Sequence, residues 1–122
     1  AANIKNIKLP VSAPFHCKLM NRATEIMSKE INDIQFKALK NNIISNVTAK
    51  PTLDPFEIKN LLIQQIEKPV RWRESVINMI NSGIQKFIEI GPGKVLSGLV
   101  KRINSNVELI QINELEDINK LI

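Results

Sequence analysis

The segment from Lys86 to Ile112 constrains the fold most, because it reads as a strand, a crossover helix and a second strand. The short apolar run KFIEI precedes a Gly-Pro-Gly turn at 91–93. Apolar residues then recur at helical spacing over 95–103, and the run VELIQI follows at 107–112. Two strands joined by a crossover helix lie parallel in one sheet. The segment therefore predicts an α/β fold.

The remainder of the chain continues the alternation of helix and strand. Asp54 and Pro55 form a helix start, with aspartate as the cap and proline at the first helical position. The predicted elements are a strand at 3–9, a helix at 18–33, a strand at 41–47, helices at 55–66 and 72–82, and a short helix at 114–122. We expect a short, mainly parallel sheet of four strands flanked by helices, with KFIEI buried and no domain boundary within 1–122.

Composition limits the classes of function. The chain has 122 residues, of which 43% are hydrophobic and 24% charged, which is ordinary for one globular domain with a modest core. The net charge of +5 indicates either an acidic partner or merely scattered lysines. One tryptophan and no tyrosine provide little for nucleic-acid bases to stack on, so we expect no nucleic-acid partner.

Membrane, metal and disulfide chemistry are not expected either. No apolar run approaches the roughly 20 residues that cross a bilayer, and the first residues do not resemble a signal peptide. The single cysteine, Cys17, excludes an internal disulfide and a zinc site built from several cysteines. The cytoplasm is the expected location.

His16, the only histidine, is the first candidate for chemistry. It ends the stretch LPVSAPFH, between a predicted strand and a predicted helix, and ligands in α/β folds bind at the carboxyl ends of strands. A neutral imidazole there suits a general base, although a lone histidine is more often structural. No serine lies in a Gly-x-Ser-x-Gly elbow. Cys17 is interpreted as a small buried residue rather than a partner of His16.

Two further motifs have plain structural interpretations. The sequence GPGK, at 91–94, follows a strand and opens a helix, where backbone N–H groups can bind an anion. It matches no established phosphate-binding motif, so a tight turn is favoured. Arg71 and Trp72 follow a proline at a helix start, where packing is more common than chemistry.

Four stretches taken in order resemble a known family. LPVSAPFHCKLM, NNIISNVT, KPVRWRESV and FIEIGPGKVLSGLVKRI are similar to the carboxyl-terminal part of the malonyl-CoA:acyl carrier protein transacylase family, and the resemblance covers nearly the whole chain. It implies a partial α/β-hydrolase-like acyltransferase core, with 1–122 as the carboxyl-terminal part of the large subdomain.

The resemblance implies serine-histidine acyl transfer in fatty acid biosynthesis. A serine accepts malonyl from malonyl-CoA and passes it to the phosphopantetheine thiol of acyl carrier protein, without a metal or a further cofactor. The family's catalytic histidine falls on His16, and a main-chain carbonyl that orients it falls on Arg71, a position often held by glutamine in relatives. Phe15, directly before the histidine, falls in the substrate pocket; in related synthase domains a phenylalanine there accompanies malonyl use.

Lys94, Lys101 and Arg102 are candidates for docking the acidic carrier protein, with a solvated helix surface as the alternative. The family's serine elbow, its carboxylate-binding arginine and its small subdomain lie amino-terminal to the region of resemblance. We therefore expect the chain alone to be inactive, with the missing amino-terminal part of the enzyme as a partner, and to expose an open sheet edge. The alternative is a non-catalytic remnant or a module that binds acyl carrier protein.

Overall fold

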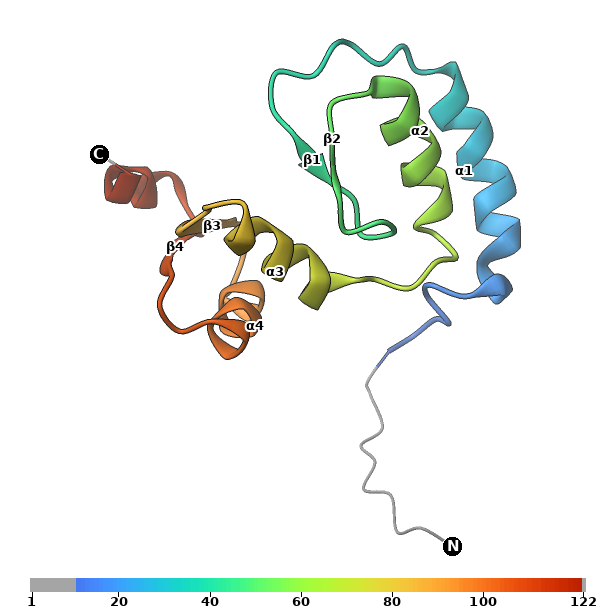
Figure 1. Cartoon of the computed structure of the whole chain (residues 1–122). Coiled ribbons are helices and arrows are strands. Elements are labelled where there is room, and N and C mark those ends of the chain that lie inside the picture. The colour runs from blue at the N-terminus through green and yellow to red at the C-terminus, as the bar shows by residue number, and fades with distance from the viewer. Residues whose placement is uncertain (1–10, 122) are drawn as a thin grey trace, which may run out of the picture. The chain divides into compact units, whose positions relative to one another are not determined.

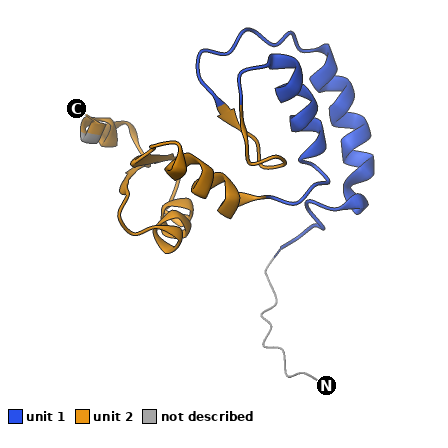
Figure 2. Ribbon diagram, viewed as in Figure 1, with its two compact units in different colours: residues 1–42, 52–70 blue, residues 43–51, 71–122 orange. Residues whose placement is uncertain are grey.

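The computed structural model of the protein describes residues 11–121 (Figure 1). It contains a 3₁₀ turn (Lys18–Met20), α1 (Asn21–Asp33), β1 (Ile43–Ile44), β2 (Pro51–Thr52), α2 (Pro55–Gln64), α3 (Trp72–Asn81), β3 (Lys86–Ile90), α4 (Val95–Ile103), β4 (Glu108–Ile112) and a closing 3₁₀ segment (Leu115–Leu121). The chain divides into two compact units, residues 1–42 with 52–70 and residues 43–51 with 71–122 (Figure 2). A single acyltransferase subdomain over 1–122, without an internal boundary, stays a prediction.

The first unit is built on α1 and α2, which lie side by side (Figure 1). The predicted start of α2 is confirmed: Asp54 Oδ1 accepts a hydrogen bond from Phe56 N at 2.9 Å, and Pro55 is the first helical residue. The helix ends at Gln64, two residues earlier than expected, because the next N–H groups bond three residues back in a tightening turn, as Ile66 N does to Ile63 O.

The second unit contains the predicted strand, helix and strand. β3 pairs with β4 in parallel, in a register that runs from Lys86 opposite Glu108 to Ile90 opposite Ile112. α4 connects the two strands and α3 packs beside it (Figure 1). Val76 of α3 is fully buried, and Val100 of α4 is nearly so. The α/β class and the parallel pair are therefore confirmed.

The predicted strand at 41–47 is wrong beyond two residues. Only Ile43–Ile44 is extended, and a turn follows in which Ser45 Oγ accepts from Val47 N at 3.1 Å. The fully buried Ala49 has the left-handed φ of 57°. The described strands form two separate two-stranded sheets, β1 with β2 and β3 with β4, instead of one. The predicted strand at 3–9 lies outside the described residues.

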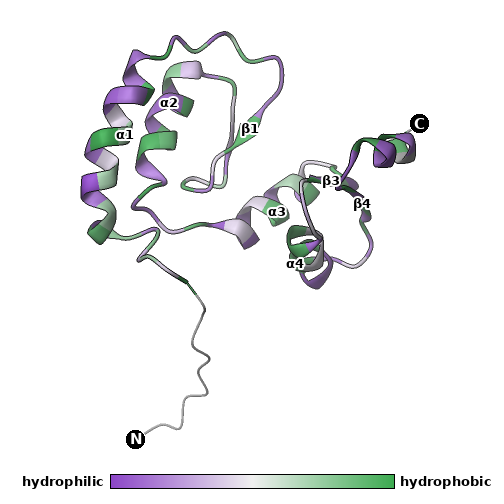
Figure 3. Cartoon of the chain, turned by 180° about the vertical axis from the view of Figure 1, so that it is seen from behind, coloured by the Kyte–Doolittle hydropathy of each residue, from purple (hydrophilic) through white to green (hydrophobic). Residues whose placement is uncertain are grey.

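The buried core is small. Within 11–121 the buried hydrophobic residues are Ala49, Ile58, Leu61, Val76, Val100 and Ile112. The helical spacing of apolar residues in α1 is confirmed, and polar and apolar positions alternate along α1 and α2 (Figure 3). α1 nevertheless buries none of its residues, and Leu19 just before it is 78% exposed. The burial of KFIEI is also wrong, since Ile90 is 80% exposed.

Glu89 holds the amino terminus of α4. Its Oε1 accepts from Leu96 N at 3.0 Å and its Oε2 from Ser97 N at 2.7 Å, whereas Lys94, the residue before the helix, caps nothing with its side chain. A carboxylate at this end satisfies free N–H groups and complements the helix dipole. The hydrogen bond from the Ser97 side chain, and after it the N–H groups of Ser97 and Leu96, lower the pKa of Glu89.

We expect Glu89→Gln to lower the melting temperature of the chain at pH 7. The pKa of Glu89 is lower in the folded than in the unfolded chain. The ionised side chain therefore stabilises the folded chain fully above the ordinary glutamate pKa, and this stabilisation is lost as the pH falls through the pKa that Glu89 has in the folded chain. The difference from the unmodified chain should therefore shrink towards pH 3. Thermal unfolding followed by circular dichroism from pH 3 to 7 measures it, with Glu30→Gln on exposed α1 as the control. If Glu89→Gln lowers the melting temperature by the same amount at pH 3 and at pH 7, the ionised carboxylate of Glu89 does not stabilise α4 in this way.

Candidate functional site

His16 lies in a strained turn at the entrance to the first helical segment. Its φ is 59°, in the left-handed region that histidine adopts more often than most residues but still at a cost. Phe15 N donates to Ala13 O at 2.9 Å within the same turn, and Cys17 is the residue that opens the 3₁₀ turn. The backbone therefore presents the imidazole at an exposed position before the helix.

One ring nitrogen of His16 has a main-chain partner. Nδ1 lies 2.8 Å from the carbonyl oxygen of Gln65, the residue that directly follows α2 as its carboxyl-terminal cap. This carbonyl is available because the last carbonyls of a helix have no intrahelical partner. A carbonyl only accepts hydrogen bonds, so Nδ1 carries the proton, and in the neutral ring Nε2 keeps its lone pair. Among residues 11–121 nothing is bonded to Nε2, so this nitrogen is free to accept a hydrogen bond.

Arg71 has a different set of contacts. Its carbonyl accepts from Ser75 N and from Ser75 Oγ, each at 3.0 Å. Its N–H donates to Asn46 O at 2.9 Å, its Nη1 donates to Thr48 O at 3.3 Å, and its Nε pairs with Glu74 Oε1 at 3.3 Å. Arg71 thus ties the turn before β2 to the start of α3. Its orienting role stays a prediction, and Gln65, whose carbonyl bonds the ring in the structure, was not among the predicted site residues.

Phe15 and Cys17, the neighbours of His16, differ in their surroundings. Phe15 is 57% exposed, and its place in the substrate pocket stays a prediction. Cys17 is half-buried and its Sγ donates to Pro14 O at 3.2 Å, so the thiol is engaged with backbone rather than with His16. Neither side chain contributes a nucleophile paired with the imidazole.

The predicted docking residues lie on α4. Lys94 and Lys101 line a cavity of about 390 Å³ together with Ser97, Gly98, Leu109 and Gln111. Arg102 is exposed on the same helix but does not line this cavity. The two lysines therefore flank one concave surface.

The GPG segment is a tight turn, as the sequence indicated. Gly91 and Gly93 have φ values of 133° and 94°, which glycine adopts without strain. Gly93 N donates to Asn113 Oδ1 at 2.7 Å and Gly91 N donates to Ile112 O at 2.9 Å. Because Glu89 takes the next free N–H groups, protein atoms already occupy the positions that an anion would use.

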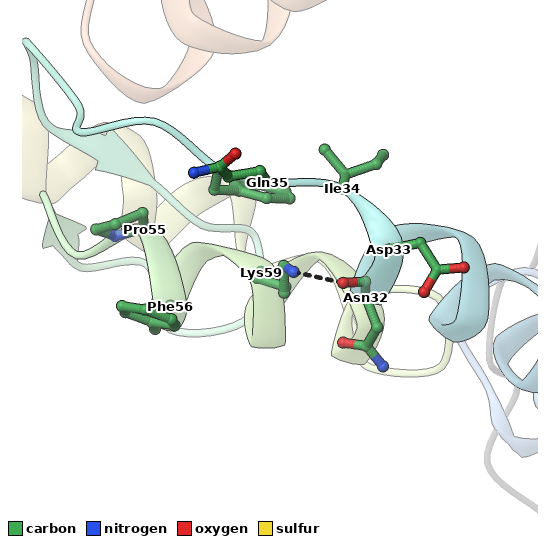
Figure 4. A pocket seen from close by; sticks show the side chains of 8 residues that line it. Asn32, Asp33, Ile34, Gln35, Pro55, Phe56 and Lys59 are labelled. Carbon is green, nitrogen blue, oxygen red and sulfur yellow. Dashed lines mark hydrogen bonds between the residues drawn. The ribbon is translucent and has the colours of Figure 1, made fainter.

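Another cavity, of about 340 Å³, lies between the end of α1 and the start of α2 (Figure 4). Pro55 and Phe56 contribute apolar wall. Lys59 Nζ donates to Asn32 O at 2.9 Å and lies 5.4 Å from the centre of the Phe36 ring. Its ammonium is therefore engaged by a helix-end carbonyl and an aromatic face. None of the predicted site residues lines this cavity.

In the described part of the chain, no three histidine, cysteine, aspartate or glutamate side chains gather as metal ligands. No helix between residues 11 and 121 has the length and apolar character that would let it cross a membrane.

Comparison with known proteins found no matching family model. A malonyl CoA-acyl carrier protein transacylase of Bacillus subtilis is 43% identical over 112 residues, which are 92% of this chain and 35% of the relative. The crystal structure of a malonyl CoA-acyl carrier protein transacylase from Clostridium perfringens is 44% identical, with a TM-score of 0.85 over 94% of this chain and 36% of that chain.

A third match is a malonyl transacylase solved in complex with its type II polyketide synthase acyl carrier protein. It is 33% identical, with a TM-score of 0.84 over 92% of this chain and 36% of that chain. The chain thus spans about a third of the length of the relatives that it matches.

Proposed function

We propose that this chain, a homologue of malonyl CoA-acyl carrier protein transacylases over about a third of their length, supplies the general base of that acyl transfer. The observation that carries the proposal is the hydrogen bond between His16 Nδ1 and Gln65 O. It directs a basic nitrogen outwards from a strained, exposed turn. The nucleophile, a serine, comes from outside residues 1–122.

In the first half-reaction, His16 Nε2 takes the proton of the serine hydroxyl as the serine oxygen attacks the thioester carbon of malonyl-CoA. The new C–O bond forms, the C–S bond breaks, and the proton on Nε2 passes to the departing thiolate. Coenzyme A leaves as the thiol, and malonyl remains as a serine ester. The Gln65 carbonyl keeps the ring in one orientation throughout.

In the second half-reaction, the phosphopantetheine thiol of acyl carrier protein gives its proton to Nε2 and attacks the ester carbon. The C–S bond forms, the C–O bond breaks, and the serine oxygen recovers the proton from the ring. The histidine is neutral again at the end, so no net proton is consumed. One imidazole thus serves both directions of the transfer.

A fused protein tests this proposal, with the part of the Bacillus subtilis transacylase that the chain does not match joined to residues 1–122. We expect it to transfer malonyl from malonyl-CoA to acyl carrier protein. The chain alone should form no malonyl ester detectable by mass spectrometry, because no serine in it lies in an elbow sequence. A folded fused protein without transfer contradicts the proposal.

We place Phe15 at the malonyl end of the substrate pocket, on the support of its position beside His16 and its exposed ring. In that position the ring would crowd a methyl group on the α-carbon, and a pocket contact of this size is worth about 1–3 kcal/mol. The fused protein should therefore prefer malonyl-CoA over methylmalonyl-CoA by about tenfold or more in kcat/KM, and Phe15→Ala should narrow that preference. Equal values for both substrates before any substitution contradict this placement.

We assign carrier-protein docking to Lys94, Lys101 and Arg102, on the support of their charge and of the cavity between the two lysines. Lys101→Glu in the fused protein should raise the KM for acyl carrier protein about tenfold and leave the KM for malonyl-CoA unchanged, because a rim charge changes association with the charged partner. The control is Lys29→Glu on exposed α1. If both substitutions raise the KM for acyl carrier protein equally, the net charge of the chain, and not the position of Lys101, determines binding of the carrier protein.

The same cavity supports the alternative function, a module that binds acyl carrier protein without catalysis. In that case the isolated chain binds the carrier with an affinity that falls on Lys101→Glu, while the fused protein transfers no malonyl. Titration calorimetry with the carrier and the transfer assay together separate the two functions.

A further inference from the structure

One side of α1 and of the residues that flank it carries an exposed apolar stripe. Its members, Leu19, Ile26, Met27 and Ile34, are between 45% and 78% exposed. Intervals of seven and eight residues bring them to the same side of a helix with 3.6 residues per turn. Half-buried residues such as Met20, Thr24, Ser28 and Ile31 lie on the adjoining side. A stripe spaced in this way is typical of the seam between two paired helices.

Charged residues of both signs follow the apolar stripe along α1. Arg22 is the second residue of the helix, Asp33 is its last, and Glu25 and Lys29 lie between them. All four are exposed, and none forms an ion pair with another described residue. If a second copy of α1 lies antiparallel and is centred on Met27, Lys29 lies opposite Glu25 of that copy. Arg22 then lies within one residue of Asp33, whereas a parallel copy would bring like charges together.

The same antiparallel alignment matches the apolar residues. Ile26 comes within one residue of Met27 of the second copy, and Leu19 comes within one residue of Ile34. Ile34 lines the cavity of about 340 Å³ at the end of α1, together with the apolar side chains of Pro55 and Phe56. The most exposed member of the stripe therefore meets an apolar cavity at the opposite end of the helix. Because the arrangement is symmetric, each of these contacts forms twice.

We propose that two copies of this chain associate through α1, antiparallel and about a twofold axis near Met27. The apolar stripe supplies the buried area, and the opposite charges at the two ends of the helix select the antiparallel orientation. Every residue of this interface belongs to the first unit, and the inference is independent of the proposed function. A helix pair of this length is at the small end of specific interfaces, so we expect a dissociation constant on the order of 10 µM.

Sedimentation velocity of the whole chain, from low micromolar to submillimolar concentration, tests whether it dimerises. We expect an equilibrium between monomer and dimer that saturates at the dimer. Added salt should weaken it, because exposed charge pairs are screened. A chain that stays monomeric throughout overturns the inference. Oligomers that keep growing beyond the dimer also overturn it, because a surface that fits only itself closes after two copies.

An exchange of charges tests which residues meet. Arg22→Asp and Asp33→Arg should each weaken self-association about tenfold or more, because each turns two attractive pairs into repulsive ones. An equimolar mixture of the two variants should associate about as tightly as the unmodified chain, because both pairs are then attractive again. Each new charge lies at the end of α1 where the helix dipole favours it, so the helix should stay folded.

The matched control is Arg73→Asp, the same change of charge at the second residue of α3. It should leave self-association unchanged. If Arg73→Asp weakens the dimer as much as Arg22→Asp does, net charge and not α1 determines association, and the inference is overturned. It is also overturned if the mixture of Arg22→Asp and Asp33→Arg associates no more tightly than either variant alone.

Disulfide cross-linking tests the antiparallel orientation. Because Cys17 is the only cysteine, Cys17→Ser gives a background in which one new cysteine can be placed at will. In that background Ile26→Cys, close to the twofold axis, should form a disulfide dimer under mild oxidation. Leu19→Cys should not, because its counterpart lies at the other end of the interface. A disulfide at Leu19→Cys that forms as fast as at Ile26→Cys, or none at Ile26→Cys, overturns the antiparallel pairing.

Discussion

His16→Ala in the fused protein will lower kcat/KM for malonyl transfer by about a thousandfold or more, while the circular dichroism spectrum stays unchanged. The substitution removes the group that we propose deprotonates the serine and later the carrier thiol, and general acid–base catalysis typically contributes 10²–10⁴-fold. The exposed ring packs little, so folding should survive its loss. Steady-state transfer to acyl carrier protein measures the effect.

Two control variants separate the contribution of a main-chain carbonyl from that of the side chain on the same residue. Gln65→Ala keeps the carbonyl that accepts from His16 Nδ1, so it should cost less than about tenfold, or ~1.4 kcal/mol. Arg71→Ala should also cost less than about tenfold, because the carbonyl of Arg71 is bonded to Ser75 and the ring of His16 is bonded to Gln65 O instead. If either variant loses as much kcat/KM as His16→Ala while it is still folded, the substituted side chain contributes to the transfer. The prediction that only its main chain matters is then wrong.

Val76→Asp will unfold the second unit. Val76 is the largest fully buried side chain among the described residues, and an aspartate there is an uncompensated buried charge that costs about 3–5 kcal/mol. This is a large part of the roughly 5–15 kcal/mol that stabilises a typical domain. Soluble yield and thermal unfolding measure the loss.

Val95→Asp is the matched control, because Val95 is 72% exposed and is the first residue of α4. A carboxylate at a helix amino terminus is tolerated or mildly favourable, so the melting temperature should hardly change. Equal losses in the two variants would mean that Val76 is not part of a specific core.

Local signals predicted most elements correctly. The Asp54–Pro55 pair identified the start of α2, and the glycine after α3 identified its end. Periodicity identified the β3–α4–β4 segment and its parallel pairing. These features depend on residues within one turn of each other or on a crossover of ordinary length, so the sequence alone contains them.

Contacts between distant residues decided what the sequence could not predict. The run at 41–47 has the branched residues of a strand, but the N–H of Arg71 donates to Asn46 O within it and the amide of Asn78 donates to Ala49 O just after it, and these bonds hold the chain there as a turn. The burial of KFIEI was expected from its apolar composition, and composition does not say whether a neighbouring strand is present. Glu89 gave no sign of capping α4, because a charged residue on a strand usually faces water.

The catalytic role of His16 stays a prediction. The sequence placed this histidine at the boundary before a helix, and the structure has it there. The acceptor of its Nδ1 is a main-chain oxygen 49 positions away. Every residue has such an oxygen, so no pattern of side chains could distinguish Gln65 from Arg71.

The left-handed backbone of His16 has an evolutionary consequence. At a φ of 59° glycine is free of the steric strain that histidine carries there. A lineage under selection for folding alone would drift towards glycine or asparagine here, whereas selection for catalysis keeps the costlier imidazole. Sequencing this position across neighbouring strains therefore distinguishes a decaying remnant from a working enzyme part, without any assay.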